Sequence, residues 1–142
     1  MGPHGHIVRE ALGTITLIAD GPLEGEEISR RFAAVDIYLA PFIDGVSTRR
    51  TSLMTALQHG VATVGTYGCH TDTMLLKEDG RAFLLSAANA PDAFTQNVLH
   101  LVNDLDMRRG IALEGQRFYQ QNFSWSIITC SMLSALKATK QQ

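Results

Sequence analysis

Apolar and polar positions follow two different periods along the chain. Continuous apolar runs, typical of strands buried on both faces, occur at residues 14–19, 36–41, 61–66 and 82–85. Apolar side chains that recur every three to four positions, as in amphipathic helices, occur at residues 7–12, 25–34, 48–59, 91–103, 107–122 and 124–137. A short helical turn is expected within residues 68–76. Gly60 favours a helix end at that position, and Trp125 is expected to be buried at the start of the last helix.

This alternation of strands and helices predicts the fold class. Short loops between strands and helices imply right-handed crossovers and a parallel sheet. We therefore expect an α/β fold: an open, Rossmann-like parallel sheet of about four strands, with helices on both faces and a helical C-terminus. A length of 142 residues fits one domain, 1–142, with residues 1–6 disordered.

Composition excludes several classes of function. The net charge is −2, so no overall field attracts nucleic acid or an anionic membrane. Cys69 and Cys130 are too few for a disulfide framework, which favours a reducing, cytoplasmic location. No signal peptide or transmembrane segment is predicted. His4 and His6 lie in a polar terminus, and no metal-binding motif is found.

The loop after the run at 36–41 is the strongest candidate site, because ligands bind at the carboxyl ends of parallel strands. Ser47 or Thr48 is a candidate N-cap of the helix at 48–59, and Gly45 permits backbone conformations closed to other residues. Arg49 and Arg50 in the first helical turn oppose the usual dipole preference, and a bound phosphate would resolve that conflict. The alternative is an ordinary turn with solvated arginines.

Two further groups of residues surround this loop. Asp44 either forms the turn or contacts a polar ligand such as a sugar hydroxyl. At the next strand end, Gly68 permits close backbone approach, and His70 and Asp72 are candidates for the same crevice; His70 is otherwise a surface residue. Cys69 has no paired base at a known spacing, which argues against a catalytic thiol.

The order of these segments resembles the C-terminal, donor-binding domain of group 1 retaining glycosyltransferases with the GT-B fold. The segments that carry the resemblance are Gly21-Pro22-Leu23, Ala40-Pro41-Phe42, Asp44-Gly45, His59-Gly60-Val61 and Asn122-Phe123-Ser124-Trp125. It implies transfer of a hexose from a nucleoside diphosphate sugar to an acceptor hydroxyl, without a metal or other cofactor.

The resemblance also implies roles for residues of the loop. Asp44, in the place of a family glutamate, would be the catalytic-site contact to the donor sugar. Gly45, Val46, Ser47, Thr48, Arg49 and Arg50 would hold the diphosphate. Thr55 replaces the glutamate that contacts the ribose, and the loop before it is longer than in the family. Asp44 is shorter than glutamate, and Thr55 lacks a carboxylate.

Larger parts of the family's enzymes have no counterpart here. The first βαβ portion of the donor domain and the N-terminal acceptor domain are both missing. We therefore expect a fragment that is inactive alone and that self-associates through exposed apolar surface. The alternatives are a sugar-nucleotide epimerase on the same scaffold and a non-catalytic nucleotide- or phosphate-binding or interaction module.

Overall fold

The computed structural model describes residues 16, 18 and 21–139, and the chain divides into two compact units, 1–31 and 32–142. The expected helix at 7–12 lies outside the described residues. Of the expected strand at 14–19 only Thr16 and Ile18 are described, and neither belongs to a strand. Helix α2 (Gly25–Ala33) confirms the expected helix at 25–34. It is acidic in its first turn and basic in its last, as the helix dipole favours.

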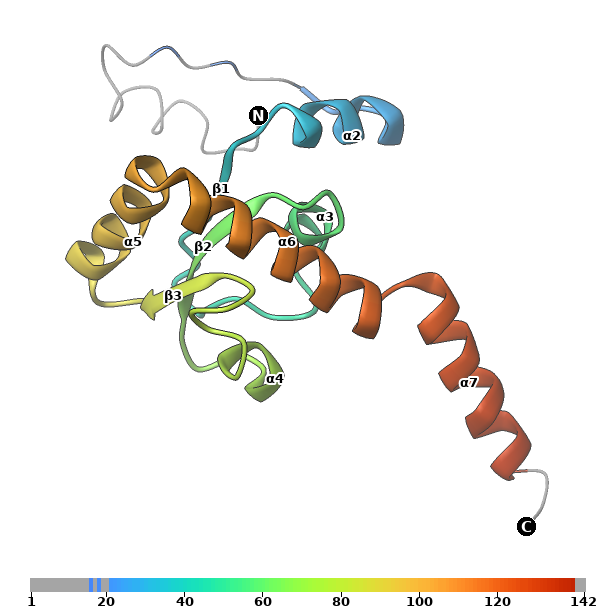
Figure 1. Ribbon diagram of the computed structural model, residues 1–142. Coiled ribbons are helices and arrows are strands. Elements are labelled where there is room, and N and C mark those ends of the chain that lie inside the picture. Colours follow the sequence, from blue (N-terminus) through green and yellow to red (C-terminus); the bar gives the residue numbers. More distant parts are fainter. Residues whose placement is uncertain (1–15, 17, 19–20, 140–142) are drawn as a thin grey trace. The chain divides into compact units, whose positions relative to one another are not determined.

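The second unit contains a parallel sheet of three strands among its described residues. These strands are β1 (Ile37–Ala40), β2 (Ala62–Tyr67) and β3 (Leu84–Ala87), in the spatial order β1-β2-β3 (Figure 1). Both pairs are parallel, with Tyr38 beside Thr63 and Thr66 beside Ser86. The α/β class and the parallel sheet are thus confirmed, with three described strands where about four were expected.

Helices connect and follow these strands (Figure 1). Their bounds are α3 (Thr51–Gln58), α4 (Thr73–Leu76), α5 (Pro91–Asn103), α6 (Leu105–Asn122) and α7 (Trp125–Thr139). Pro91 begins α5, where its missing N–H costs no hydrogen bond. Gly60, with φ of 64°, follows the C-cap of α3.

Two apolar clusters form the core. One contains Leu53 and Leu57 of α3 with Leu85 and Phe118, and the other contains Val64, Leu84, Leu101 and Ile111. Successive side chains of a strand point to opposite faces, so Leu84 and Leu85 place the two clusters on the two sides of the sheet. The sheet is therefore covered on both faces, as the continuous apolar runs predicted.

Two elements, α3 and β3, begin at least two residues later than predicted. Helix α3 begins at Thr51 with Arg50 as an N-cap that makes no side-chain capping bond, so neither Ser47 nor Thr48 caps it. The reason is a preceding turn, in which the Ser47 carbonyl accepts the Arg50 N–H. Strand β3 begins two residues later than expected, because the Glu78 carbonyl accepts the N–H groups of Arg81 and Ala82 and extends a turn.

Helix α7 has no buried residue and leads away from the sheet in Figure 1. The expected burial of Trp125 is wrong, since this side chain is 80% exposed within the chain. Met132 and Leu136 on the same helix are each 61% exposed. Helix α6 directs Ile111 and Phe118 into the two core clusters, and neither cluster includes a residue of α7. Self-association through this exposed surface stays a prediction.

Candidate functional site

Two loops meet at the carboxyl ends of β1 and β2. Gly45 has φ of 89°, and a Cβ atom on Gly68 would lie 2.8 Å from the Asp44 carbonyl carbon. Only glycines allow the two backbones to approach this closely. The His70 N–H donates to the Asp44 carbonyl at 3.0 Å, and the Val46 N–H donates to the Thr66 carbonyl at 2.8 Å. The predicted roles of both glycines as backbone-permissive positions are therefore confirmed.

Asp44 lies at the centre of a charged cluster. One Arg50 nitrogen, Nη2, lies 2.5 Å and 2.6 Å from the two Asp44 carboxylate oxygens, and His70 Nδ1 lies 3.3 Å from Oδ2. The hydrogen bond with His70, followed by a backbone N–H and the Arg50 charge, lowers the pKa of Asp44 below 3.8. Asp44 is therefore a carboxylate at neutral pH, and its cation partner stacks on the Phe42 ring at 4.3 Å.

Asp72 closes the other side of the loop. Its carboxylate accepts the Thr48 N–H at 2.6 Å, and this bond is the main reason that the pKa of Asp72 is lowered below 3.8. A smaller lowering comes from the Arg49 charge. The carboxylate of Asp72 thus takes the Thr48 N–H, a donor that was expected to bind an external anion.

Fewer backbone N–H groups of the loop are available to a ligand than the sequence predicted. The N–H groups of Gly45 and Val46 donate to the Phe42 and Thr66 carbonyls, and the Arg50 N–H donates to Ser47. Together with Thr48, four loop amides therefore already have partners in the chain. Val46 also directs its side chain into the core, where it is 1% exposed. Backbone N–H groups in a loop that packs on a sheet are shielded from water and need hydrogen-bond acceptors within the chain. These N–H groups are therefore not available to an external anion.

A polar pocket of about 310 Å³ is lined by Asp44, Ser47, Arg49, Arg50 and His70. Two cations and one anion give this lining a positive balance. Within the described part of the chain, Arg49 makes no ion pair, and the hydroxyl of Ser47, a residue only 4% exposed, makes no hydrogen bond. The pocket therefore offers a guanidinium and a hydroxyl that are not committed elsewhere.

The structure brings together most of the predicted site residues, but not all. Thr55 lies within α3, where its hydroxyl donates to the Thr51 carbonyl at 2.8 Å, and it lines neither of the two pockets described here. The pairing of Arg50 with Asp44 and the capture of the Thr48 amide by Asp72 were not predicted. The second links residues 24 positions apart, and sequence spacing carries no signal for such a contact.

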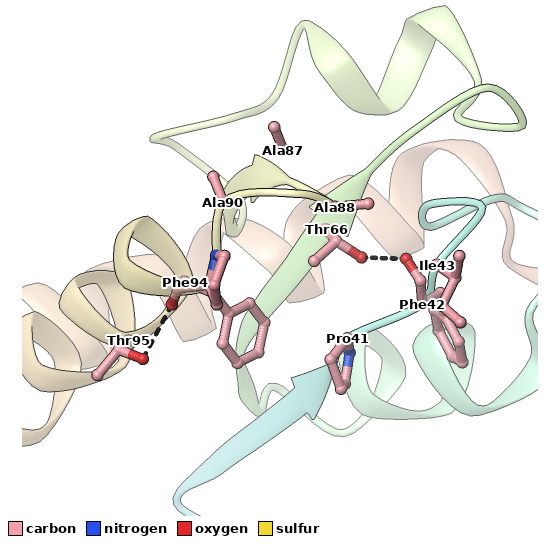
Figure 2. A pocket seen from close by; sticks show the side chains of 10 residues that line it. Pro41, Phe42, Ile43, Thr66, Ala87, Ala88, Ala90, Phe94 and Thr95 are labelled. Atoms are coloured by element: carbon pink, nitrogen blue, oxygen red, sulfur yellow. Dashed lines mark hydrogen bonds between the residues drawn. The ribbon is translucent and has the colours of Figure 1, made fainter.

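A second, apolar pocket lies at the carboxyl ends of all three strands, with a volume of about 200 Å³ (Figure 2). Its lining comes from Pro41, Phe42, Ile43, Thr66, Ala87, Ala88, Ala90, Pro91, Phe94 and Thr95. Figure 2 shows the Phe94 ring projecting from α5 toward Pro41. Sequence reasoning missed this pocket, although apolar residues directly after two strand ends were a usable signal.

Comparisons with known proteins leave the family open. Among the described residues, no three potential metal ligands gather into a group, and no helix has the length and hydropathy to span a membrane. A scan against protein-family models gives no match to this chain. A search of curated proteins likewise gives no match.

Proposed function

We propose that the chain binds the diphosphate of a nucleotide sugar in the polar pocket, as the donor-binding portion of a glycosyltransferase. The observation that carries this proposal is the pocket itself, in which side chains from two adjacent strand ends meet beside Arg49, a guanidinium that makes no ion pair with any described residue. Ligands of open parallel sheets bind at this edge, and a guanidinium matches phosphate oxygens in charge and geometry.

The chemistry of sugar transfer gives these groups distinct tasks. Breaking the bond between the sugar and the diphosphate develops negative charge on the leaving oxygen. Arg49 and the Ser47 hydroxyl would stabilise that charge, because both already lie in the pocket and need little reorganisation. Asp44 is held by Arg50 and His70, so its carboxylate is positioned to accept a hydrogen bond from a sugar hydroxyl.

A second candidate function is a non-catalytic module that binds a nucleotide or phosphate. The observation that favours it is the state of the two carboxylates. Asp44 is paired with Arg50 and His70, and Asp72 is bonded to the Thr48 N–H, so both groups are ionised and engaged. A carboxylate with a lowered pKa is a weak proton acceptor, which suits binding better than acid–base catalysis.

Calorimetric titration with uridine and guanosine diphosphates tests binding. We expect Arg49→Ala to weaken the affinity at least about tenfold, because it removes charge-assisted hydrogen bonds. Arg109→Ala is the matched control, since Arg109 is exposed on α6 and lines neither of the two pockets. Absence of binding by both diphosphates would refute the proposal.

Incubation with a nucleoside diphosphate sugar separates the two candidates. Release of free sugar or of the nucleoside diphosphate, lost in Asp44→Asn, would support the enzyme. Tight binding with an intact donor after prolonged incubation would support the non-catalytic module. Chromatography of the nucleotide fraction gives the readout for both outcomes.

A further inference from the structure

His70, in the loop that follows β2, is held in the polar pocket through one ring nitrogen. Its Nδ1 lies 3.3 Å from Asp44 Oδ2, and Asp44, whose pKa is lowered below 3.8, is a carboxylate that can only accept hydrogen bonds. The hydrogen of this bond therefore belongs to Nδ1. The other ring nitrogen, Nε2, makes no hydrogen bond within the described part of the chain, so it is available to a ligand.

The protonation state of His70 decides what Nε2 offers to an anion. A neutral imidazole carries a single N–H, which the bond to Asp44 places on Nδ1, and Nε2 then presents a lone pair that repels a phosphate oxygen. A protonated imidazole carries an N–H on both nitrogens and a positive charge. The side chain of His70 is 60% exposed and lines the polar pocket, so protons from water reach it. Only the protonated ring can therefore donate to Asp44 and to a bound anion at the same time.

The charges of the polar pocket favour the protonated ring when a diphosphate is bound. The charged side chains that share the lining with His70 are Asp44, Arg49 and Arg50, which leave one net positive charge. Nη2 of Arg50 is already bonded to both Asp44 oxygens, whereas Arg49 makes no ion pair in the described chain. The diphosphate of a nucleotide sugar carries two negative charges, and a protonated His70 supplies the second positive charge that matches them.

Two further titratable groups lie on the same loop as His70. The Asp72 carboxylate accepts the Thr48 N–H at 2.6 Å, and its pKa is lowered below 3.8, so it stays ionised near neutral pH. Cys69 is exposed and lines neither of the two pockets. Over the range in which an imidazole titrates, His70 is therefore the one group of the polar pocket lining whose charge changes.

We propose that His70 binds the donor diphosphate as an imidazolium, which donates its Nδ1–H to Asp44 and its Nε2–H to a phosphate oxygen. This inference rests on the proposed donor binding in the polar pocket. No covalent bond of the donor changes in this step. Where His70 starts neutral, one proton passes from water to Nε2 as the donor binds, so the affinity for the donor falls as the pH rises.

Calorimetric titration with uridine diphosphate glucose, in phosphate-free buffers at about pH 5.5 and about pH 7.5, tests this role. The probe is a diphosphate esterified at both ends, so it lacks the terminal phosphate group that itself titrates near about pH 6. We expect binding to be at least about fivefold tighter at the lower pH, because the imidazolium adds a charge-assisted hydrogen bond. At the higher pH, buffers of different ionisation enthalpy should reveal a net uptake of protons on binding.

Three variants separate the charge of His70 from a merely structural role. His70→Gln keeps an N–H donor but no titratable group, so its affinity should be weak and equal at both pH values, without proton uptake. His70→Lys keeps a positive charge at both pH values and should also bind equally at both. His100→Gln is the matched control, because His100 is exposed on α5 and lines neither of the two pockets; it should retain the pH dependence of the unchanged chain.

The outcomes distinguish the role of His70 from donor binding itself. Equal affinity of the unchanged chain at both pH values would overturn the role of His70 and leave donor binding intact. A pH dependence that survives in His70→Gln or in His70→Lys would overturn it as well, so a folding defect in one variant leaves the other to decide. If the nucleotide sugar binds at neither pH, the donor proposal falls and the role of His70 falls with it.

Discussion

Asp72 accepts the Thr48 N–H at 2.6 Å, so replacing this carboxylate tests whether the chain blocks part of its own anion site. A hydrogen bond to a charged group contributes about 1.5–3 kcal/mol, and partial exposure to water reduces this to about 1 kcal/mol here. Asp72→Ala should therefore lower the unfolding temperature by roughly 3–5 °C for a chain of this size. Asp72→Asn keeps an acceptor and should lose about half as much.

The same substitutions should strengthen anion binding. They remove a negative charge that acts on Arg49 and, in Asp72→Ala, release the Thr48 N–H as a donor. We expect the affinity for uridine diphosphate to rise about fivefold, close to 1 kcal/mol. Thermal unfolding followed by circular dichroism gives the stability, and calorimetry gives the affinity.

Glu24→Gln is the control for charge, because Glu24 is exposed and lies outside the loop. It should change neither quantity measurably. Unchanged stability in Asp72→Ala would show that the bond to Thr48 contributes nothing. Weaker diphosphate binding in Asp72→Ala would mean that Asp72 supports the site instead of competing with its ligand. Either result would refute the reasoning.

Further predictions concern the backbone, the ionisation and the exposed helix. Gly45→Ala should lower the free energy of unfolding, measured in urea, by more than about 2 kcal/mol. Gly80→Ala is the control: Gly80 has φ of 77° but open space around it, so this change should lower the free energy of unfolding by only about 1 kcal/mol. Equal losses would contradict the close contact between the two loops. A titration of the Asp44 carboxyl carbon, followed by nuclear magnetic resonance, should give a pKa below 3.8, and His70→Gln should raise this pKa. Because folding lowers the pKa of Asp44, its contribution to stability should be present above pH 3.8 and lost as the pH falls through the pKa of the folded state. A titration midpoint of Asp44 at or above 3.8 in the folded chain would contradict this pH dependence. Trp125, the single tryptophan, should emit as solvent-exposed indole in dilute solution and shift to shorter wavelength on concentration if α7 mediates self-association; emission independent of concentration would count against that surface.

The sequence by itself determined the local elements of this protein. The period of apolar positions predicted α2 and α5 closely, and the three described strands within about two residues. These features depend on neighbours a few residues apart, which a window of sequence contains. The same holds for Gly45, whose left-handed conformation follows from a tight turn at a strand end. The strand-end rule also located the candidate loop.

Only the tertiary structure decided which polar groups of that loop form hydrogen bonds or ion pairs within the described chain and which line the polar pocket. Asp72 takes the Thr48 amide, and Asp44 takes Arg50 and His70, leaving Arg49 and Ser47 to line the polar pocket without such partners in the described chain. The apolar pocket likewise exists because three strand ends meet. The physical reason is that the parallel register brings separate loops together, and the backbone N–H groups of these loops then bond to the acceptors that this packing supplies.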